Sequence, residues 1–487
     1  MRKETNIEQE LVTPVRYKGN KVITRIFYTF YVLMILLICG ATFFARNFLL
    51  DWLTRFEAAQ PTVKSAEVFE EHFAQPDWLA LYEKAQLTDT AYEGSEAFNA
   101  YMTALVGDNE LTYAETSAGL SGDHKYLIRV NDKTIGYFTL TNMADQEEPI
   151  PDWQLSDLQL YVNRKHSVTV QMLDGHTAYV NGQALDATKT IQTISTVAEQ
   201  YLPDGTSGVR LLRQQVTDLL VAPEVTILDE NGAPCEFYYD EEAGMYTEVL
   251  PEPEEIPAEL AERAIKAGEA YSYFMVNRYT SLFRDYFATG TQTYRNIMSM
   301  DRWQQPSTAA AITGQAVSDY VRYTENLYSV RVKMTMELTR NNKSVKEYPM
   351  DTTMFLENRK DGWMVIAMTN VDVTEQTSQV RLTFMMDDTQ LSTGLYADDA
   401  TNAFSPAITA PEGQVFSGWA KKDVAEDGTI TMTLVYTCDN AFRLVLPEGE
   451  KLEPNVLYPI FEDAPTDAEE IEEIDPETAY ADIEAVG

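Results

Sequence analysis

The sequence predicts a multi-domain α+β protein with an N-terminal transmembrane helix, and three observations carry this prediction. A chain of 487 residues is too long for one hydrophobic core, so several domains are expected. One stretch of twenty residues near the N-terminus, Ile26 to Ala45, carries no charge. After it, segments with the three- and four-residue spacing of amphipathic helices alternate with segments that have the two-residue spacing of strands.

Charge and composition exclude several classes of protein. The chain has 37 Lys and Arg against 76 Asp and Glu, which gives a formal net charge of −39. The electrostatic field of such a negatively charged chain repels the phosphate backbone of nucleic acids, so no nucleic-acid partner is expected. With 45% hydrophobic residues the chain has enough apolar material for packed cores. Three Cys and four His are too few for a disulfide scaffold or a Cys/His zinc module.

Residues 26–45 predict a transmembrane helix that holds the chain in a lipid bilayer. Twenty residues at about 1.5 Å each span roughly the 30 Å of a hydrocarbon core. Residues 1–25 contain six basic and three acidic residues, whereas the rest of the chain contains 31 basic and 73 acidic residues. Because the basic flank of a span stays inside the cell, we expect a cytoplasmic tail at 1–25. The protein is then a single-pass cell-membrane protein whose C-terminal bulk is extracellular.

A cleaved signal peptide is the alternative to an anchor. The apolar stretch is long for a signal peptide, and Phe43 and Phe44 stand where a signal peptidase needs small residues. A lipoprotein site at Cys39 would need a small residue at position 38, where the chain has Ile38. We therefore expect an uncleaved anchor, which the region around Trp52 extends as an interfacial part of the same helix.

Residues 60–160 predict a first α+β module. Apolar residues recur at helical spacing from Pro61 to about Gly107. From Tyr126 the spacing changes to two, and Asn131-Asp132 predicts the turn of a hairpin.

Residues 166–250 predict a β-rich module with a helix at 189–220. Short apolar runs flank Asn181-Gly182, which is a strong signal for a type I′ hairpin. The stretch VTVQMLDGHTAYVNGQAL resembles a small module of Gram-positive surface proteins, among them membrane proteins associated with teicoplanin resistance. This resemblance implies a bacterial cell envelope. The proline-rich acidic segment 251–257 predicts an extended linker.

Residues 258–372 predict a cone-like α+β domain. A helical region is expected at 258–289, followed by three strands at 328–338, 348–356 and 363–367. This order, with its Asp-Gly-Trp hairpin, resembles the nuclear transport factor 2-like fold. The resemblance implies a pocket for a small ligand or a glycan, although ordinary core packing explains the same aromatic residues. The candidate lining residues are Tyr271, Tyr279, Tyr286, Trp303, Tyr328 and Trp363.

Residues 379–461 predict a C-terminal module. The Gly413–Trp419 stretch and the closing Leu-Tyr-Pro-Ile-Phe strand resemble the internalin-type B repeat, or Listeria–Bacteroides repeat, of bacterial surface proteins. The resemblance implies a β-grasp-like fold in which Pro459 lies at a sheet edge. It also implies a core of large aromatic side chains, so the motif is structural. Its residues are Phe416, Gly418, Trp419, Leu457 and Tyr458. The acidic residues 463–487 predict a disordered tail.

No motif for nucleotide, zinc-protease, calcium or serine-hydrolase chemistry occurs in the sequence. We therefore expect no catalytic residue, no cofactor and no metal, and Cys235 and Cys438 are expected to be free thiols. The four histidines are isolated in the sequence and are expected to be surface or turn residues: His72, His124, His166 and His176.

The predicted function is binding or assembly outside the membrane, without enzymatic activity. The expected partners are the lipid bilayer, through Ile26–Ala45, and a cell-wall polymer or other envelope proteins. The alternative is an extracytoplasmic ligand-binding receptor or an enzyme that uses the aromatic pocket. A deep pocket in which Asp285 or Asp319 faces Tyr328 would favour that alternative, whereas a core filled with Met and aromatic side chains would not.

Overall fold

The computed structural model describes residues 21–116, 122–144, 150–301, 307–399, 403–425, 429–439, 441–447 and 449–464. The predicted mixed α+β class, with several β-sheets and an N-terminal apolar helix, is confirmed. The chain divides into two compact units, Met1–Asn163 and Arg164–Gly487. The expected tail at 1–25 lies largely outside the described residues, and so does most of the acidic tail at 463–487.

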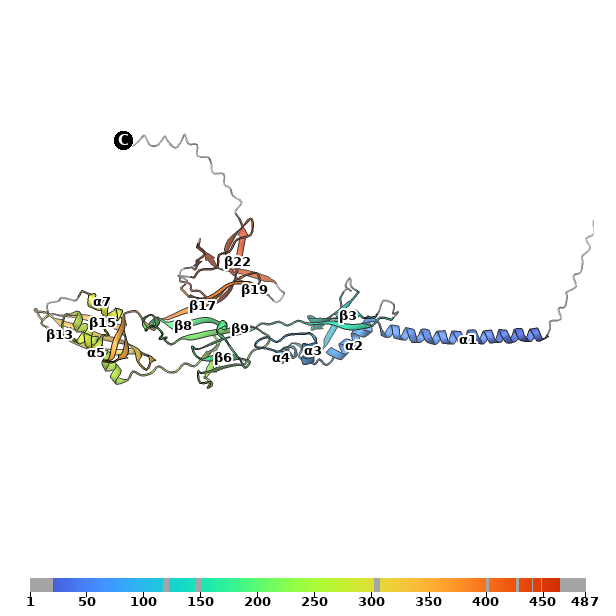
Figure 1. Cartoon of the computed structure of the whole chain (residues 1–487), viewed down its shortest axis with the longest axis horizontal. Helices are drawn as coiled ribbons and strands as arrows, with labels where there is room; N and C mark the ends of the chain where they lie inside the picture. Colours follow the sequence, from blue (N-terminus) through green and yellow to red (C-terminus); the bar gives the residue numbers. More distant parts are fainter. Residues whose placement is uncertain are drawn as a thin grey trace, which may run out of the picture. The chain divides into compact units, whose positions relative to one another are not determined.

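Helix α1, Lys21–Ala58, is one continuous helix of 38 residues (Figure 1). Its apolar side chains are exposed along its length, and Phe44 is 76% exposed. In the described part of the chain, α1 is the one helix long and apolar enough to cross a membrane, and none of this stretch is buried. The predicted continuation of the helix beyond Ala45 and through Trp52 is therefore confirmed, and α1 is a candidate membrane span.

The remainder of the first unit packs three helices with a four-stranded antiparallel sheet in the order β1-β2-β3-β4. Asn131 (φ 46°) and Asp132 (φ 65°) join β2 to β3 in the left-handed conformations that a type I′ turn requires. Phe98, Met102 and Phe138 fill the core and are fully buried. The elements are α2 (Pro61–Phe73), α3 (Trp78–Lys84), α4 (Ser95–Val106), β1 (Leu111–Glu115), β2 (His124–Val130), β3 (Lys133–Asn142) and β4 (Trp153–Leu160).

The second unit begins with a β-rich region, residues 164–250, that we call the middle module. Its elements are β5 (His166–Leu173), β6 (Thr177–Val180), β7 (Gln183–Ala184), η1 (Ala187–Lys189), β8 (Thr190–Thr196), η2 (Val197–Tyr201), β9 (Leu211–Leu219), β10 (Val225–Leu228), β11 (Phe237–Asp240) and β12 (Met245–Glu248). The hairpin predicted at Asn181-Gly182 joins β6 to β7, with φ of 50° and 78°.

The helix predicted at 189–220 is wrong. Residues 190–196 form strand β8 and residues 211–219 form strand β9, with only a short 3-10 turn between them. The physical reason lies in the composition of β8, which reads TIQTIST and is mostly β-branched. Such side chains lose χ1 freedom in a helix and pack well on a pleated sheet.

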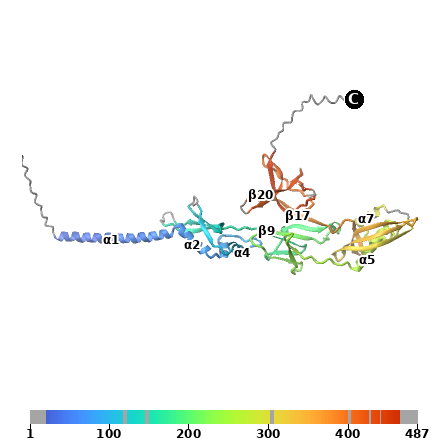
Figure 2. The same cartoon turned by 180° about the vertical axis from the view of Figure 1, so that it is seen from behind.

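Residues 258–369 form a second region, which we call the helix–sheet module. Helices α5 (Ala258–Met275), α6 (Leu282–Tyr286) and α7 (Gln292–Ser299) contact a sheet whose antiparallel strands follow the order β13-β14-β15-β16. Figures 1 and 2 show α5 and α7 beside this sheet from two sides. The strands are β13 (Ala309–Thr324), β14 (Leu327–Thr339), β15 (Val345–Arg359) and β16 (Gly362–Thr369).

The sequence prediction for this module was incomplete in two places. The helical region expected at 258–289 is broken after α5, because Asn277 and Tyr279 adopt positive φ of 55° and 44°. Four strands are present where three were expected, since β13 was not predicted. Many β13 side chains are exposed, and its bulges interrupt the alternation that marks a strand.

Residues 376–463 form the C-terminal module, which contains β17 (Gln376–Met386), β18 (Thr389–Ala397), β19 (Gln414–Val424), β20 (Ile430–Cys438), β21 (Leu444–Val445) and β22 (Asn455–Asp463). Strand β22 lies between β17 and β19. Only residues 455–457 of β22 pair with β17, so Pro459 has its one paired neighbour on β19. Strand β17 also pairs with β8 of the middle module, through residues 376–380 and 192–196, so the two modules share one sheet.

Candidate functional site

The five described aromatic residues of the predicted pocket do not lie around one cavity, since Tyr328 is fully buried and Tyr279 is exposed. Tyr328 is fully buried, and its hydroxyl donates to the Leu260 carbonyl oxygen at 3.2 Å. The Trp363 ring packs edge-on against Tyr328, with the ring centroids 4.9 Å apart. Tyr271 packs half-buried against the same core, and burial raises the pKa of its hydroxyl. Tyr271 and Trp363 therefore pack against the core that contains Tyr328, and Tyr286 does so as well.

The other three residues have different environments. Tyr279 is 64% exposed and makes an edge contact with Tyr273. The Arg263 guanidinium lies 4.2 Å from the centroid of the Tyr286 ring. Tyr286 and Trp363 line the same surface hollow of about 280 Å³, whose other walls are mainly charged side chains. Trp303 lies outside the described residues.

The described residues in the interior of the helix–sheet module pack into one hydrophobic core. Its buried residues are mainly aromatic, aliphatic and methionine side chains: Phe274, Phe283, Phe287, Val330, Val332, Met334, Met354 and Leu356. Burial raises the pKa of the Tyr328 hydroxyl far above its ordinary value, so this group stays protonated. Neither aspartate of the expected polar dyad faces Tyr328, because Asp285 is exposed and the Asp319 carboxylate contacts Arg331 and Ser318. The Tyr328 hydroxyl bonds to the Leu260 carbonyl oxygen.

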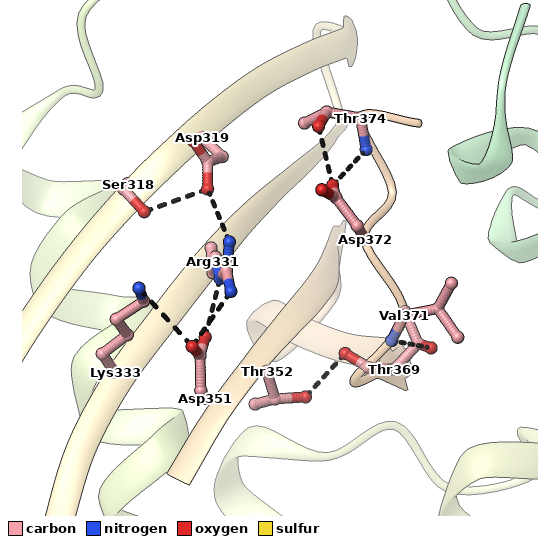
Figure 3. A network of polar contacts seen from close by, with 10 residues as sticks. All are labelled: Ser318, Asp319, Arg331, Lys333, Asp351, Thr352, Thr369, Val371, Asp372 and Thr374. Carbon is pink, nitrogen blue, oxygen red and sulfur yellow. Dashed lines mark hydrogen bonds and ion pairs between the residues drawn. The ribbon is translucent and has the colours of Figure 1, made fainter. Parts of the chain in front are cut away.

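A polar hollow of about 190 Å³ lies beside β14 and β15, next to the end of β16, and Figure 3 shows its contacts. Arg331 on β14 donates to Asp351 on β15 through two hydrogen bonds, from Nε at 2.7 Å and from Nη2 at 3.0 Å. Asp319 lies 3.7 Å from Arg331 Nη1, and Lys333 lies 3.5 Å from Asp351. The Arg331 hydrogen bonds hold the pKa of Asp351 below its usual value.

The other wall of the hollow is formed by the chain after β16. Asp372 accepts hydrogen bonds from the Thr374 backbone N–H at 2.9 Å and from its hydroxyl at 2.7 Å (Figure 3), which lowers the pKa of Asp372. Thr352 donates to the Thr369 carbonyl at 2.9 Å. These polar groups are bonded to one another, and Arg331 is already held by a bidentate carboxylate. The network therefore holds this part of the sheet in place. Because the Arg331 guanidinium is already paired, it is not free to bind an anionic ligand.

The C-terminal motif residues form a core. Trp419 and Leu457 are fully buried, and the Trp419 ring lies edge-on to Phe384, with centroids 4.7 Å apart. The Phe416 ring lies 5.6 Å from Trp419. The remaining aromatic ring of the motif, Tyr458, faces the Lys422 ammonium at 5.3 Å. These contacts are structural, since they join β17, β19 and β22 around large aromatic side chains.

Gly418 lies at the bulge of β19, where the register shifts between Phe416 and Gly418. Its φ is 154°, and a Cβ atom there would lie 2.5 Å from the Tyr436 carbonyl oxygen. The close approach of the neighbouring strand explains why this position holds glycine.

Strand β20 exposes an apolar row. Ile430, Met432 and Leu434 alternate along the strand and are 55%, 38% and 46% exposed. In the described structure residues 430–436 pair with β19 only, because β21 pairs with residues 437 and 438 alone. This half of β20 is thus an unpaired edge with apolar side chains, which is a typical surface for strand addition.

His176, one of the histidines expected to be isolated, lies together with Cys235 and Glu248 in the middle module. His176, Cys235 and Glu248 place their ligand atoms within 4.8 Å of one another, and the Glu248 side chain is only 4% exposed. Burial raises the pKa of the Cys235 thiol, and the Glu248 carboxylate adds to this effect. Such a thiol is a weak nucleophile near neutral pH. All three cysteines are free thiols, and Cys438 lies outside this cluster, beside Ser405.

Comparisons with known proteins give structural neighbours but no family. No family model matches the chain, and no curated protein matches it significantly. A solved structure described as an "Ntf2 like protein involved in plasmid conjugation" aligns with 54% of this chain and 78% of its own, at 6% sequence identity. Its TM-score of 0.18 is too low to support any argument about fold or function.

Proposed function

We propose that the chain is a single-pass membrane protein with a cytoplasmic N-terminus, whose extracytoplasmic modules bind or assemble components of a Gram-positive-type envelope. We propose further that it has no catalytic activity of its own. The observation that carries the proposal is α1, because a continuous apolar helix that is exposed along its length needs an apolar environment. Its orientation follows from charge, since the excess of basic residues lies before the span and the excess of acidic residues after it.

The finer fold assignments belong to the same proposal. Three helices on an antiparallel sheet support a nuclear transport factor 2-like helix–sheet module. The core around Trp419 supports a β-grasp-like, B repeat-like C-terminal module. The likeness of this motif, and of the hairpin at Asn181-Gly182, to modules of bacterial surface proteins supports an envelope location.

Binding is proposed at the free edge of β20. An extended segment of another envelope protein would pair with the backbone of residues 430–436, and its apolar side chains would cover Ile430, Met432 and Leu434. Thr431 and Thr433 point to the opposite face of the same strand and are also exposed. They provide matched positions for a control.

The anchoring test places charge in the middle of α1. The double variant Leu33→Arg, Leu37→Arg should move the protein from the membrane fraction, since each arginine costs about 2.5–3.5 kcal/mol at the centre of a span. Leu79→Arg in α3, where the leucine is 40% exposed, is the control and should stay in the membrane. Wild-type protein in the soluble fraction without detergent would refute anchoring.

The binding test uses a photo-crosslinking amino acid at Met432 or at Thr433 in living cells. Crosslinks to one envelope protein from position 432, and their loss in an Ile430→Lys, Leu434→Lys variant, would support the proposal. A Thr431→Lys, Thr433→Lys variant should keep them. Equal crosslinking from position 432 in the two lysine double variants would contradict the proposed binding at β20. No comparable observation in the described structure supports the alternative, a receptor or an enzyme that uses the aromatic pocket. We therefore propose binding and assembly alone.

A further inference from the structure

We propose that His176, Cys235 and Glu248 form a binding site for a zinc-type divalent cation in the middle module. An imidazole nitrogen, a sulfur and a carboxylate oxygen lie within 4.8 Å of one another. These three donor types are the ones that zinc takes in proteins. The mixture of one soft sulfur with nitrogen and oxygen donors favours zinc over the oxygen-seeking calcium and magnesium ions.

Three separate segments position the three ligands. His176 lies in the tight turn after β5, next to Gly175, whose φ is 98°. Cys235 follows β10, and its backbone N–H donates to the Ile227 carbonyl at 2.9 Å. Glu248 is the last residue of β12, and β12 pairs in parallel with β5. Backbone pairing therefore fixes the spacing of the ligands, as a preorganised site requires.

Of the two ligand separations from His176, one already fits a tetrahedral zinc ion and the other is shorter than such an ion requires. His176 Nδ1 lies 3.6 Å from Cys235 Sγ and 2.8 Å from Glu248 Oε1. With zinc bonds of about 2.3 Å to sulfur and about 2.05 Å to nitrogen and oxygen, tetrahedral angles separate nitrogen from sulfur by about 3.6 Å and nitrogen from oxygen by about 3.4 Å. The first separation is already present, and the second needs an opening of about half an ångström.

A supporting contact orients the carboxylate. Glu248 Oε2 accepts a hydrogen bond from the Leu173 backbone N–H at 2.9 Å, which leaves Oε1 toward His176. Partners of this kind hold metal ligands in place. The Glu248 side chain is almost fully buried, and a cation would compensate this buried carboxylate. Three protein ligands leave a fourth position for water, which is the arrangement of an open zinc site.

A cysteine–histidine catalytic pair explains the geometry less well. In such a pair the nucleophile and the orienting carboxylate contact different ring nitrogens. Here Cys235 Sγ and Glu248 Oε1 both approach Nδ1 of His176. A neutral ring nitrogen either donates or accepts, so Nδ1 can satisfy only one of these contacts. A cation at the point where the three donors converge satisfies all of them together.

The test uses full-length protein in detergent micelles, stripped with a chelator and titrated with Zn²⁺ and, separately, with Co²⁺. Wild type should bind one equivalent of Zn²⁺, and Co²⁺ should give the charge-transfer absorption of a thiolate–cobalt bond. Cys235→Ser and His176→Gln should each weaken Zn²⁺ binding by more than about 100-fold and abolish the charge-transfer band.

The matched control is Cys438→Ser, which removes a free thiol outside the cluster and should bind Zn²⁺ as wild type does. The cobalt spectrum of wild type tests the site without any variant, so misfolding of a variant cannot hide the answer. The proposal is refuted if wild type gives no thiolate–cobalt band. It is also refuted if Cys438→Ser loses that band while Cys235→Ser keeps it.

Discussion

Replacing Gly418 by alanine should selectively destabilise the C-terminal module. The added Cβ would lie 2.5 Å from the Tyr436 carbonyl oxygen and 2.8 Å from a Leu434 methyl group. The leucine methyl can move, but the carbonyl belongs to the backbone of the neighbouring strand. The φ of 154° also disfavours an L-residue at this position. Two separate penalties therefore act on one substitution.

Both penalties have known scales. A sparsely populated backbone conformation costs about 1–3 kcal/mol, and overpacking of a well-packed site costs another 1–3 kcal/mol or so. The expected loss is therefore about 2–6 kcal/mol, a large part of the 5–15 kcal/mol that typically stabilises a domain. At about 1.4 kcal/mol per factor of ten, amide protons that exchange through opening of this module should exchange at least about 30-fold faster.

The assay is hydrogen–deuterium exchange on the full-length chain, read by mass spectrometry of peptides from β19 and β22. Gly394→Ala, on β18 of the same module, is the matched control. Its Cβ would meet the Tyr396 ring at 3.4 Å, which is ordinary contact. Peptides from β14 and β15 should be unchanged in both variants. Exchange in β19 that is the same in Gly418→Ala and Gly394→Ala would refute the described bulge.

Three further outcomes are expected. Gly268→Ala should cost about 0–2 kcal/mol, measured by exchange in α5, because a Cβ there would lie 2.6 Å and 3.0 Å from the movable methyl ends of Met334 and Met350 and 3.1 Å from a Val332 methyl group, and the gain in helix propensity offsets only part of this overpacking. Gly182→Ala should cost about 1–2 kcal/mol from its φ of 78° alone, seen as faster exchange in β6 and β7; no change would argue against the type I′ turn. The Arg331 hydrogen bonds lower the pKa of Asp351, so their stabilisation is present above the ordinary carboxyl pKa and is lost as pH falls through the lowered value. Because intrinsic amide exchange itself slows on acidification, the quantity to compare is protection corrected for the intrinsic rate. Protection in β15 should fall on acidification more in wild type than in Asp351→Asn, and an equal fall would contradict this pairing.

The features that the sequence predicted well depend on local signals. Asn-Asp and Asn-Gly turns require positive φ at adjacent positions, and both hairpins formed where these pairs occur. The alternation from Tyr328 to Leu338 similarly became β14, with the apolar residues of that run buried. The length of the uncharged stretch was enough to predict the helix at 26–45.

The features that it missed depend on tertiary contacts. Strand β8 gains its sheet neighbours from β9 and from β17, a strand about 180 residues later in the sequence, which no local spacing reveals. Cys235 and Glu248 lie 59 and 72 residues from His176, far from any metal-ligand spacing. The aromatic residues of the helix–sheet module have the same spacing whether they line a pocket or fill a core, and Tyr328 proved to be core.

The central claim is that α1 spans a membrane with the C-terminal bulk outside the cell. The most direct test is protease protection in intact protoplasts that carry one epitope at the N-terminus and another at the C-terminus. Added protease should remove the C-terminal epitope and leave a small membrane-bound fragment with the N-terminal one. If the C-terminal epitope survives until the protoplasts are lysed, the proposed topology is wrong.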